Sequence, residues 1–186
     1  MPDRDVIGRM RREMEQTVEA FRQDVARVRT GRASTALLDP IHVNYYGART
    51  PLRQVATLAA PEPRLLVVTP YDKSALHEIE KAIQTSDLGL VPINDGKVLR
   101  IPIPELTEER RKELVRHVRK IAEEFRVSLR NHRRDANDAL RDEHKSKQLS
   151  DDDWHAAQAE VQRLTADYIA RLDKVLAAKE KEILEV

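Results

Sequence analysis

The chain has 186 residues, enough for one or two domains with a buried core. Charged side chains make up 35% of it and aromatic ones only 4%, a balance that favours long, solvent-exposed helices over a compact all-β body. Apolar residues recur with a clear period, which excludes intrinsic disorder. There is no cysteine, so disulfides, thiolate nucleophiles and cysteine-based zinc sites are excluded together.

The N-terminus is charged and lacks the apolar segment of a signal peptide. No apolar run approaches the length of a membrane span. We therefore expect a soluble protein of the cytoplasm with no membrane partner.

The net charge of +1 conceals an uneven distribution. Residues 107–134 hold ten basic and five acidic side chains, a net charge of +5. Residues 135–186 hold eight basic and thirteen acidic side chains, a net charge of −5. A concentrated basic stretch in a near-neutral chain indicates a local anionic partner.

The first predicted element is a helix over residues 3–29, because apolar side chains recur there in steps of three and four. Thr30-Gly31 then interrupts the pattern, and a glycine at such a place can close a helix. The apolar face consists of Val6, Met10, Met14, Val18, Phe21, Val25 and Val28.

Residues 32–104 differ in character and contain eight of the nine prolines. Asp95-Gly96 is a hairpin-type turn signal. The runs typical of strands are 41–46, 65–69 and 98–101. A short helix is expected over 74–85, with Ser74 as its N-cap and Leu76, Ile79 and Ile83 on one face. The segment is predicted to be a small inserted α+β domain.

Two further helices are predicted, over 107–147 and 150–185. Thr107 and Ser150 are suitable N-caps, and acidic residues occupy both first turns, as the helix dipole favours. The expected apolar face of the long helix is Leu114, Val118, Ile121, Phe125, Leu129 and Ala136. That of the last helix is Trp154, Ala157, Val161, Leu164, Tyr168, Leu172 and Val175.

Three long amphipathic helices must each bury an apolar stripe, so an antiparallel three-helix bundle is expected. The predicted fold class is α+β, with a bundle of residues 1–30 and 105–186 and an inserted domain of residues 31–104. Two linkers and no continuous helix join the parts, which allows a hinge. The linker residues are Thr30, Gly31, Pro104, Glu105 and Leu106.

The long helix carries the chemistry that the sequence singles out. On a wheel of about 100° per residue its basic side chains occupy a different face from its apolar ones. Arginine predominates in this basic sector, and guanidinium groups bind phosphate oxygens bidentately. The sector comprises Lys112, Arg116, Arg119, Lys120, Arg126, Arg130, Arg133, Arg134 and Arg141.

A basic helix face is most often only a solvated face, but solubility alone does not require arginine. Helix-turn-helix and zinc-finger spacings are missing, which disfavours sequence-specific DNA binding. Aromatic platforms for single strands are also missing. Recognition of folded RNA through its shape and backbone remains.

The acidic and histidine clusters at 142–144 and 151–155 provide little support for a metal site, because adjacent helical residues point in different directions. His132 falls on the core side of the long helix, where a packed or bundle-edge histidine is the simpler interpretation. The sequence contains no P-loop, GxGxxG motif or Ser-His-Asp context. We therefore expect no catalytic residue, no metal and no cofactor.

Six motifs lie between residues 28 and 137: VRTGRAS at 28–34, YYG at 45–47, TPLRQ at 50–54, AIQTSDLGL at 82–90, LTEERRK at 106–112 and VSLRNHRRDAN at 127–137. Together, and in this order, they resemble the ribosome recycling factor family. The resemblance implies an L-shaped fold with a hinge between a three-helix bundle and a β/α/β domain. It also implies action with elongation factor G and GTP, which that partner hydrolyses, to split the post-termination ribosome into subunits.

The resemblance further implies that the bundle contacts large-subunit ribosomal RNA and that the small domain meets the elongation factor. The residues it assigns to RNA are Arg29, Arg32, Arg130 and Arg133, with Arg110, Arg111 and Arg134 as weaker candidates. For Arg29 and Arg32 the alternative is a hinge role through salt bridges to the long helix. A monomer is expected. The rival class, a coiled-coil adaptor that binds only protein, needs an exposed apolar seam, and three helices with one stripe each leave none.

Overall fold

The structure is a computed structural model that describes residues 2–185, with the side chains of residues 2–4 left out of the description. It divides into two compact units. One comprises the residues up to Arg29 together with Glu108–Glu185, and the other comprises Thr30–Thr107. In the described part of the chain no helix is both long enough and apolar enough to span a membrane.

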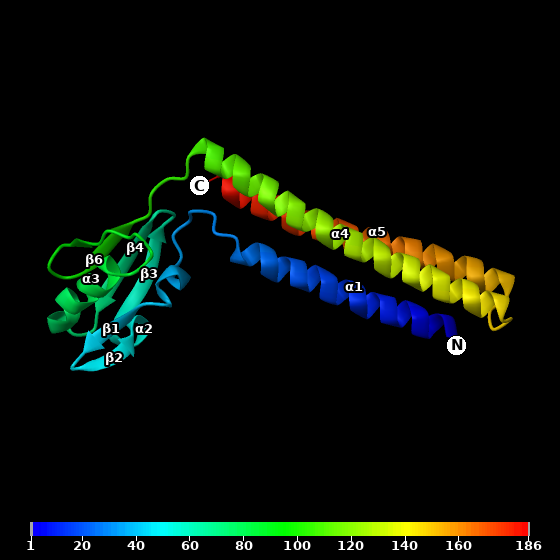
Figure 1. The fold of residues 1–186 in the computed structure, drawn as a ribbon, viewed down its shortest axis with the longest axis horizontal. Helices are drawn as coiled ribbons and strands as arrows, with labels where there is room; N and C mark the ends of the chain where they lie inside the picture. Colours follow the sequence, from blue (N-terminus) through cyan, green and yellow to red (C-terminus); the bar gives the residue numbers. More distant parts are fainter. Residues whose placement is uncertain (1, 186) are drawn as a thin grey trace. The chain divides into compact units, whose positions relative to one another are not determined.

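The first unit is an antiparallel bundle of three long helices, as predicted, and Figure 1 shows them running alongside one another. Ion pairs fix their directions. Arg11 of the first helix pairs with Glu160 of the last, and Glu15 pairs with Arg171. The residue numbers increase in the same direction on both helices, so these two helices are parallel. The helices are α1 (Pro2–Arg27), α4 (Glu108–Lys145) and α5 (Asp151–Leu184).

The bundle core follows the predicted stripes with a shift on two helices. On α1 the predicted residues from Val6 to Val25 are buried. On α4, Ala122 and Leu140 are fully buried, whereas Ile121 and Phe125 are half-buried. On α5, Leu176 is buried in place of Val175. A helical wheel drawn for one helix does not predict these extra buried residues, because two neighbouring helices bury a wider sector of its surface than a single apolar stripe.

A polar cluster joins α1 to α5. Arg171 donates two hydrogen bonds to the carboxylate of Glu15, at 2.8 and 2.7 Å, and the hydroxyl of Tyr168 donates a third at 3.1 Å. The Arg171 guanidinium also lies over the Tyr168 ring, 4.9 Å from its centroid. The hydrogen bonds from Arg171 are the main reason why the pKa of Glu15 falls from 4.5 to about 2.

Glu15→Gln is expected to reduce the loss of stability in acid. The folded pKa of Glu15 lies below its unfolded value, so its contribution is fully present above about pH 4.5 and is lost as the pH falls toward 2. Because Glu15 and Arg171 are 52% and 42% exposed, solvent screening limits the effect to about 1 kcal/mol. Urea unfolding between pH 2 and 7 measures it. Glu124→Gln, on an exposed carboxylate, should keep the parent's pH dependence.

The second unit contains a hairpin and an antiparallel four-stranded sheet, in the order β3-β4-β6-β5. The three predicted strands are confirmed as β1, β4 and β6. The others were not predicted, and β3 in particular holds Ala-Ala-Pro-Glu, a sequence of low strand propensity that an edge position tolerates. The strands are β1 (His42–Tyr45), β2 (Ala48–Pro51), β3 (Ala56–Glu62), β4 (Leu65–Pro70), β5 (Ile93–Asn94) and β6 (Leu99–Pro102).

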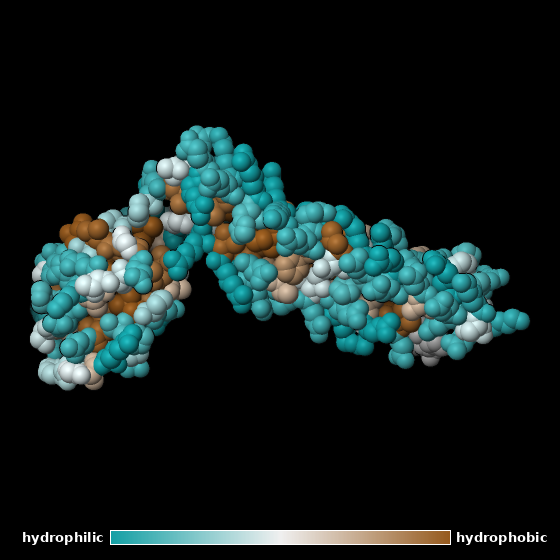
Figure 2. Space-filling view, in the orientation of Figure 1, coloured by the Kyte–Doolittle hydropathy of each residue, from teal (hydrophilic) through white to brown (hydrophobic). Residues whose placement is uncertain are grey.

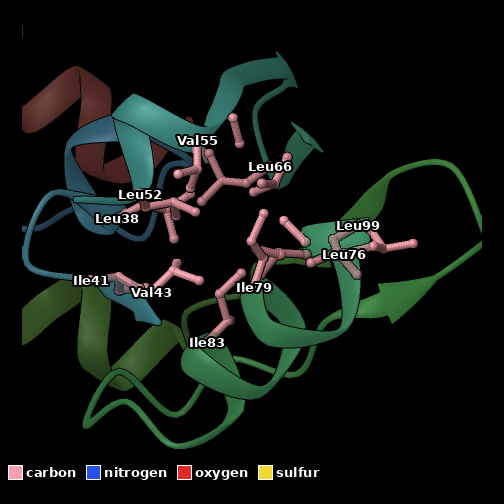
Figure 3. Packing of buried hydrophobic residues seen from close by; sticks show 14 of the residues in the cluster. Leu38, Ile41, Val43, Leu52, Val55, Leu66, Leu76, Ile79, Ile83 and Leu99 are labelled. Atoms are coloured by element: carbon pink, nitrogen blue, oxygen red, sulfur yellow. The ribbon is translucent and has the colours of Figure 1, made fainter. Parts of the chain in front are cut away.

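The short helix α3 (Leu76–Gln84) packs its apolar side into the core of this unit, and Figure 3 shows Ile79 and Ile83 directed from it toward Val43 of β1. The prediction of Ser74 as its N-cap was wrong. A 3₁₀ turn, η2 (Lys73–Ala75), precedes the helix, and the Asp72 carboxylate accepts from the N–H of Ser74 at 2.9 Å. The smaller elements of the unit are η1 (Thr35–Leu38) and α2 (Leu52–Val55).

The turn predicted at Asp95-Gly96 is confirmed and connects β5 to β6. The Asp95 carboxylate accepts from the N–H groups of Lys97 and Val98, at 2.9 and 2.8 Å. These bonds, that from Val98 first, lower the pKa of Asp95. Gly96 takes a φ of +87°, which explains the glycine at this position.

The ends of the inserted segment are fastened to each other inside the second unit. Thr30 is buried, and Gly31 lies against Leu106. Glu105 forms an ion pair with Arg64, whose carbonyl accepts from the N–H of Ile103 at 2.8 Å. For this reason the compact unit begins one residue before, and ends three residues after, the boundaries expected from composition.

Gly31→Ala is expected to destabilise the second unit by about 2–3 kcal/mol, because two costs combine. Gly31 has a φ of +77°, and an added Cβ would lie 2.7 Å from Cγ of Leu106, so Leu106 must move. Gly47→Ala is the matched control: it has the same φ of +77° and nothing within 4 Å, so it should cost only about 1–2 kcal/mol. Equal losses of stability on urea unfolding would show that the Leu106 contact is unimportant.

Candidate nucleic-acid interface

The predicted basic sector of α4 does not act as one uniform face. Arg119 donates to Glu180 of α5 at 2.6 Å, and Arg126 donates to Asp173 of α5 at 2.6 Å. Hydrogen bonding to these carboxylates raises the pKa of both arginines. The side chain of Arg126 is only 23% exposed. These two guanidinium groups therefore join α4 to α5, which corrects their placement on the free basic sector.

Arg133 continues the same row without an acidic partner. The ion pairs Arg119–Glu180 and Arg126–Asp173 are seven residues apart on each of the two antiparallel helices. A further step of seven residues along both helices places Arg133 opposite Ala166. Residues 2–185 provide no ion-pair partner for Arg133, which is half-buried. A partly desolvated arginine without a carboxylate is suited to bind an external anion.

Arg130 and Arg134 lie exposed farther around α4 and make only weak internal pairs. Arg130 donates to Glu123 at 3.0 Å, and Arg126 donates to the same carboxylate at 3.2 Å. These bonds, that from Arg130 first, lower the pKa of Glu123. Arg134 approaches Asp135 to 3.9 Å. Exposed pairs of this kind are easily exchanged for phosphate contacts. Sequence reasoning missed Glu123, although its spacing of three and seven residues from these arginines was visible.

Arg29 and Arg110 meet at a hollow between the end of α1 and the beginning of α4. Its volume is about 400 Å³, and its lining includes Asp24, Arg27 and His117. Arg110 donates to Glu113 at 2.9 Å, whereas Arg29 has no ion pair within the described bundle. The hollow combines three guanidinium groups with an aliphatic floor of Val28, Leu114 and Ile121.

The two remaining candidates occupy different surroundings. Arg111 is half-buried in the first turn of α4. Arg32 is exposed and belongs to the second unit. The structure therefore brings Arg29 and Arg110 together, and places Arg130, Arg133 and Arg134 on one stretch of α4.

His132 ties α4 to α1. Its Nε2 lies 3.0 Å from the hydroxyl of Thr17, and its Nδ1 lies 3.4 Å from a carboxylate oxygen of Glu13. The prediction of a bundle-edge histidine is confirmed.

The cluster at the α4–α5 turn is accounted for by local contacts. His144 bonds to Asp151 at 2.6 Å and stacks on Trp154 with ring centroids 4.3 Å apart. Ser150 caps α5 as predicted, accepting from the N–H of Asp153 at 3.1 Å. Among the described side chains, those of residues 5–185, no three histidines, aspartates or glutamates are grouped to hold a metal ion.

The bundle surface is largely hydrophilic on the face that Figure 2 shows. Among its described residues, the large apolar side chains that are exposed are Val127 and Leu184, at 45% and 57%. They lie at separate places on α4 and α5, and isolated apolar residues are normal on a protein surface. The described residues of the bundle therefore offer no continuous exposed apolar seam to a protein-only coiled-coil adaptor.

Comparison with known proteins agrees with this architecture along the whole chain. The family model described as ribosome recycling factor matches residues 21–184. The ribosome-recycling factor of Bacillus pumilus is 51% identical over 183 residues, which are 98% of this chain and 99% of the relative. That of Syntrophus aciditrophicus is 54% identical over 181 residues, covering 97% of this chain and 98% of the relative.

Two solved structures share the fold. A solution structure of a ribosome recycling factor is 40% identical, covers 100% of this chain and 99% of its own, and has a TM-score of 0.69. The second belongs to models for the T. thermophilus ribosome recycling factor and the E. coli elongation factor G bound to the E. coli post-termination complex. It is 49% identical, covers 99% of this chain and 100% of its own, and has a TM-score of 0.61.

A long helical bundle with an inserted α+β unit is thus shared with protein factors of translation. Within that class, the chain belongs to the ribosome recycling factor family.

Proposed function

We propose that the chain binds the post-termination ribosome and, with elongation factor G and GTP, promotes its dissociation into subunits. The observation that carries the proposal is the similarity to ribosome recycling factors from one end of the chain to the other. The second solved relative supports the choice of partner, because that protein is placed together with elongation factor G. GTP is hydrolysed by the partner, so the chain itself needs no catalytic residue, metal or cofactor.

The bundle is the part that we assign to RNA of the large ribosomal subunit. The proposed contacts are Arg29, Arg110, Arg111, Arg130, Arg133 and Arg134 of the bundle, together with Arg32 at the beginning of the second unit. Support comes from the Arg133 position, which continues a row of ion pairs without a carboxylate, and from the hollow shared by Arg29 and Arg110. Rigid helices hold these groups at fixed spacing, which suits the regular phosphates of folded RNA.

The second unit is proposed to face the elongation factor and to move relative to the bundle. The residues proposed for the hinge are Thr30, Gly31, Pro104, Glu105 and Leu106, which would keep their contacts inside the second unit and turn with it against the bundle. Spin-label pairs with one label in each unit should give a broad distance distribution. A single narrow distribution would contradict the hinge. We further propose that the protein acts as a monomer in the cytoplasm.

Light scattering by post-termination ribosomes tests the main proposal. Addition of the protein, elongation factor G and GTP together should decrease scattering as subunits separate, and omission of any one should prevent the decrease. Filter binding to large subunits across a salt series tests the RNA contact, since phosphate binding weakens steeply with salt. Binding that does not depend on salt would instead support a protein-only adaptor.

A further inference from the structure

The turn of the β1–β2 hairpin contains an aromatic residue in a strained conformation. Tyr45 pairs with Ala48, so Tyr46 and Gly47 form a two-residue turn. Their φ angles are +48° and +77°. Turns of this kind favour Asn-Gly, because a side chain with positive φ costs about 1–2 kcal/mol in other residues.

Burial does not offset this strain. The Tyr46 residue is 82% exposed, so its ring gains little from the hydrophobic effect in the free protein. Backbone strain that no burial compensates for indicates a residue kept for its function.

The exposed ring is nevertheless held in one position. Its hydroxyl donates to Asp72 at 3.3 Å, and the hydroxyl of Tyr45 donates to the same carboxylate oxygen at 3.3 Å. The two tyrosine rings pack edge to face with centroids 4.6 Å apart. Asp72 is itself fixed by Ser74: the Ser74 side chain and then its N–H lower the pKa of the Asp72 carboxyl by hydrogen bonding. An ordered aromatic side chain loses little entropy on binding.

A second exposed tyrosine lies beside this cluster. Tyr71 is next to Asp72 in sequence and is 69% exposed. Its own N–H donates to the carbonyl of Val55 at 3.0 Å, so its backbone is fixed. Tyr46 and Tyr71 therefore present two large amphipathic side chains from a rigid support.

The charge of the unit indicates which kind of partner fits this surface. Residues 30–107 contain eight basic and eight acidic side chains, a net charge of zero, in contrast to the +5 of residues 107–134. A neutral unit is not attracted to phosphates at long range. Exposed, pre-ordered tyrosines are typical anchors of protein–protein interfaces.

We propose that Tyr46 and Tyr71 anchor the second unit on the elongation factor during ribosome splitting. This inference rests on the proposed function, which supplies the protein partner. The tyrosine pair contributes to recruitment of that partner, and the bundle contributes the contact with the ribosome.

Tyr46→Asn tests the anchor, because asparagine tolerates positive φ and removes the ring. Its melting temperature should equal or exceed that of the parent, and its binding to ribosomes without the elongation factor should be unchanged. The elongation-factor concentration that gives half-maximal splitting should rise at least tenfold. Tyr71→Ser should act in the same direction. Val91→Ser, on a 69% exposed apolar residue of the same unit, should change the value less than twofold.

Three results would overturn the anchor: an unchanged elongation-factor requirement in both tyrosine variants, weaker ribosome binding by Tyr46→Asn without the elongation factor, or a large fall in its melting temperature. The second would assign the surface to the ribosome, and the third would make the ring structural. If the parent protein does not split ribosomes at any elongation-factor concentration, the proposed function fails, and the anchor fails with it.

Discussion

Arg133→Ala is expected to abolish most ribosome-splitting activity while the protein remains folded. The side chain makes no ion pair within residues 2–185, and the register of the helices brings it level with Ala166. Its removal should therefore change the free energy of unfolding by no more than about 0.5 kcal/mol. Loss of a bidentate contact to phosphate should weaken binding to the large subunit by about 1.5–3 kcal/mol. That loss corresponds to about a tenfold to 150-fold change in Kd.

Thermal melting and binding across a salt series distinguish an RNA contact from a structural role. The salt dependence of binding should fall by about one unit for the lost phosphate contact. Arg133→Lys should restore activity poorly, because lysine keeps the charge and loses the planar fork.

Arg126→Ala is the matched control in the same row. Arg126 already donates to Asp173 and Glu123, so this variant should lose stability and keep the parent's salt dependence. If Arg133→Ala melts much earlier than the parent, the residue is structural. If its binding and salt dependence are unchanged, the basic edge is only solvated.

The sequence predicts the long helices best, because each repeats its apolar pattern over many turns. Six apolar residues of α1, from Val6 to Val25, define its buried face without help from any other element. The caps are predicted less well, because Ser150 behaves as expected, whereas Asp72 caps the 3₁₀ turn before α3 and α3 itself has no side-chain cap. Both side chains can accept from nearby N–H groups, and only the preceding backbone decides which one does.

The features that the sequence does not reveal depend on contacts between distant residues. Arg126 and Asp173 are 47 positions apart, so the register of α4 and α5 must be known before Arg126 can be assigned to the contact with α5. The edge strand β3 forms because β4 offers it a partner, against its own composition. The strain at Tyr46 likewise arises from the length of the hairpin turn, which the pairing of β1 with β2 sets.

The two units also have separate cores, and this has consequences for large-to-small substitutions. In the bundle, Phe21 is 0% exposed and its ring centroid lies 5.4 Å from that of Phe125. In the second unit, Ile79 is 0% exposed and packs within a cluster drawn only from that unit. A cavity at either residue removes contacts from one core only.

Phe21→Ala is expected to destabilise the bundle by about 3–5 kcal/mol and to leave the second unit unchanged. Ile79→Ala should cost the second unit about 2–5 kcal/mol and leave the bundle unchanged. Hydrogen exchange resolved by residue measures both: exchange should accelerate in α1, α4 and α5 for the first variant, and in β4, β6 and α3 for the second. Acceleration across the whole chain in either variant would mean that the units unfold together. Separate responses are what the proposed hinge requires, because a unit that moves on its own must keep its fold without its neighbour's core.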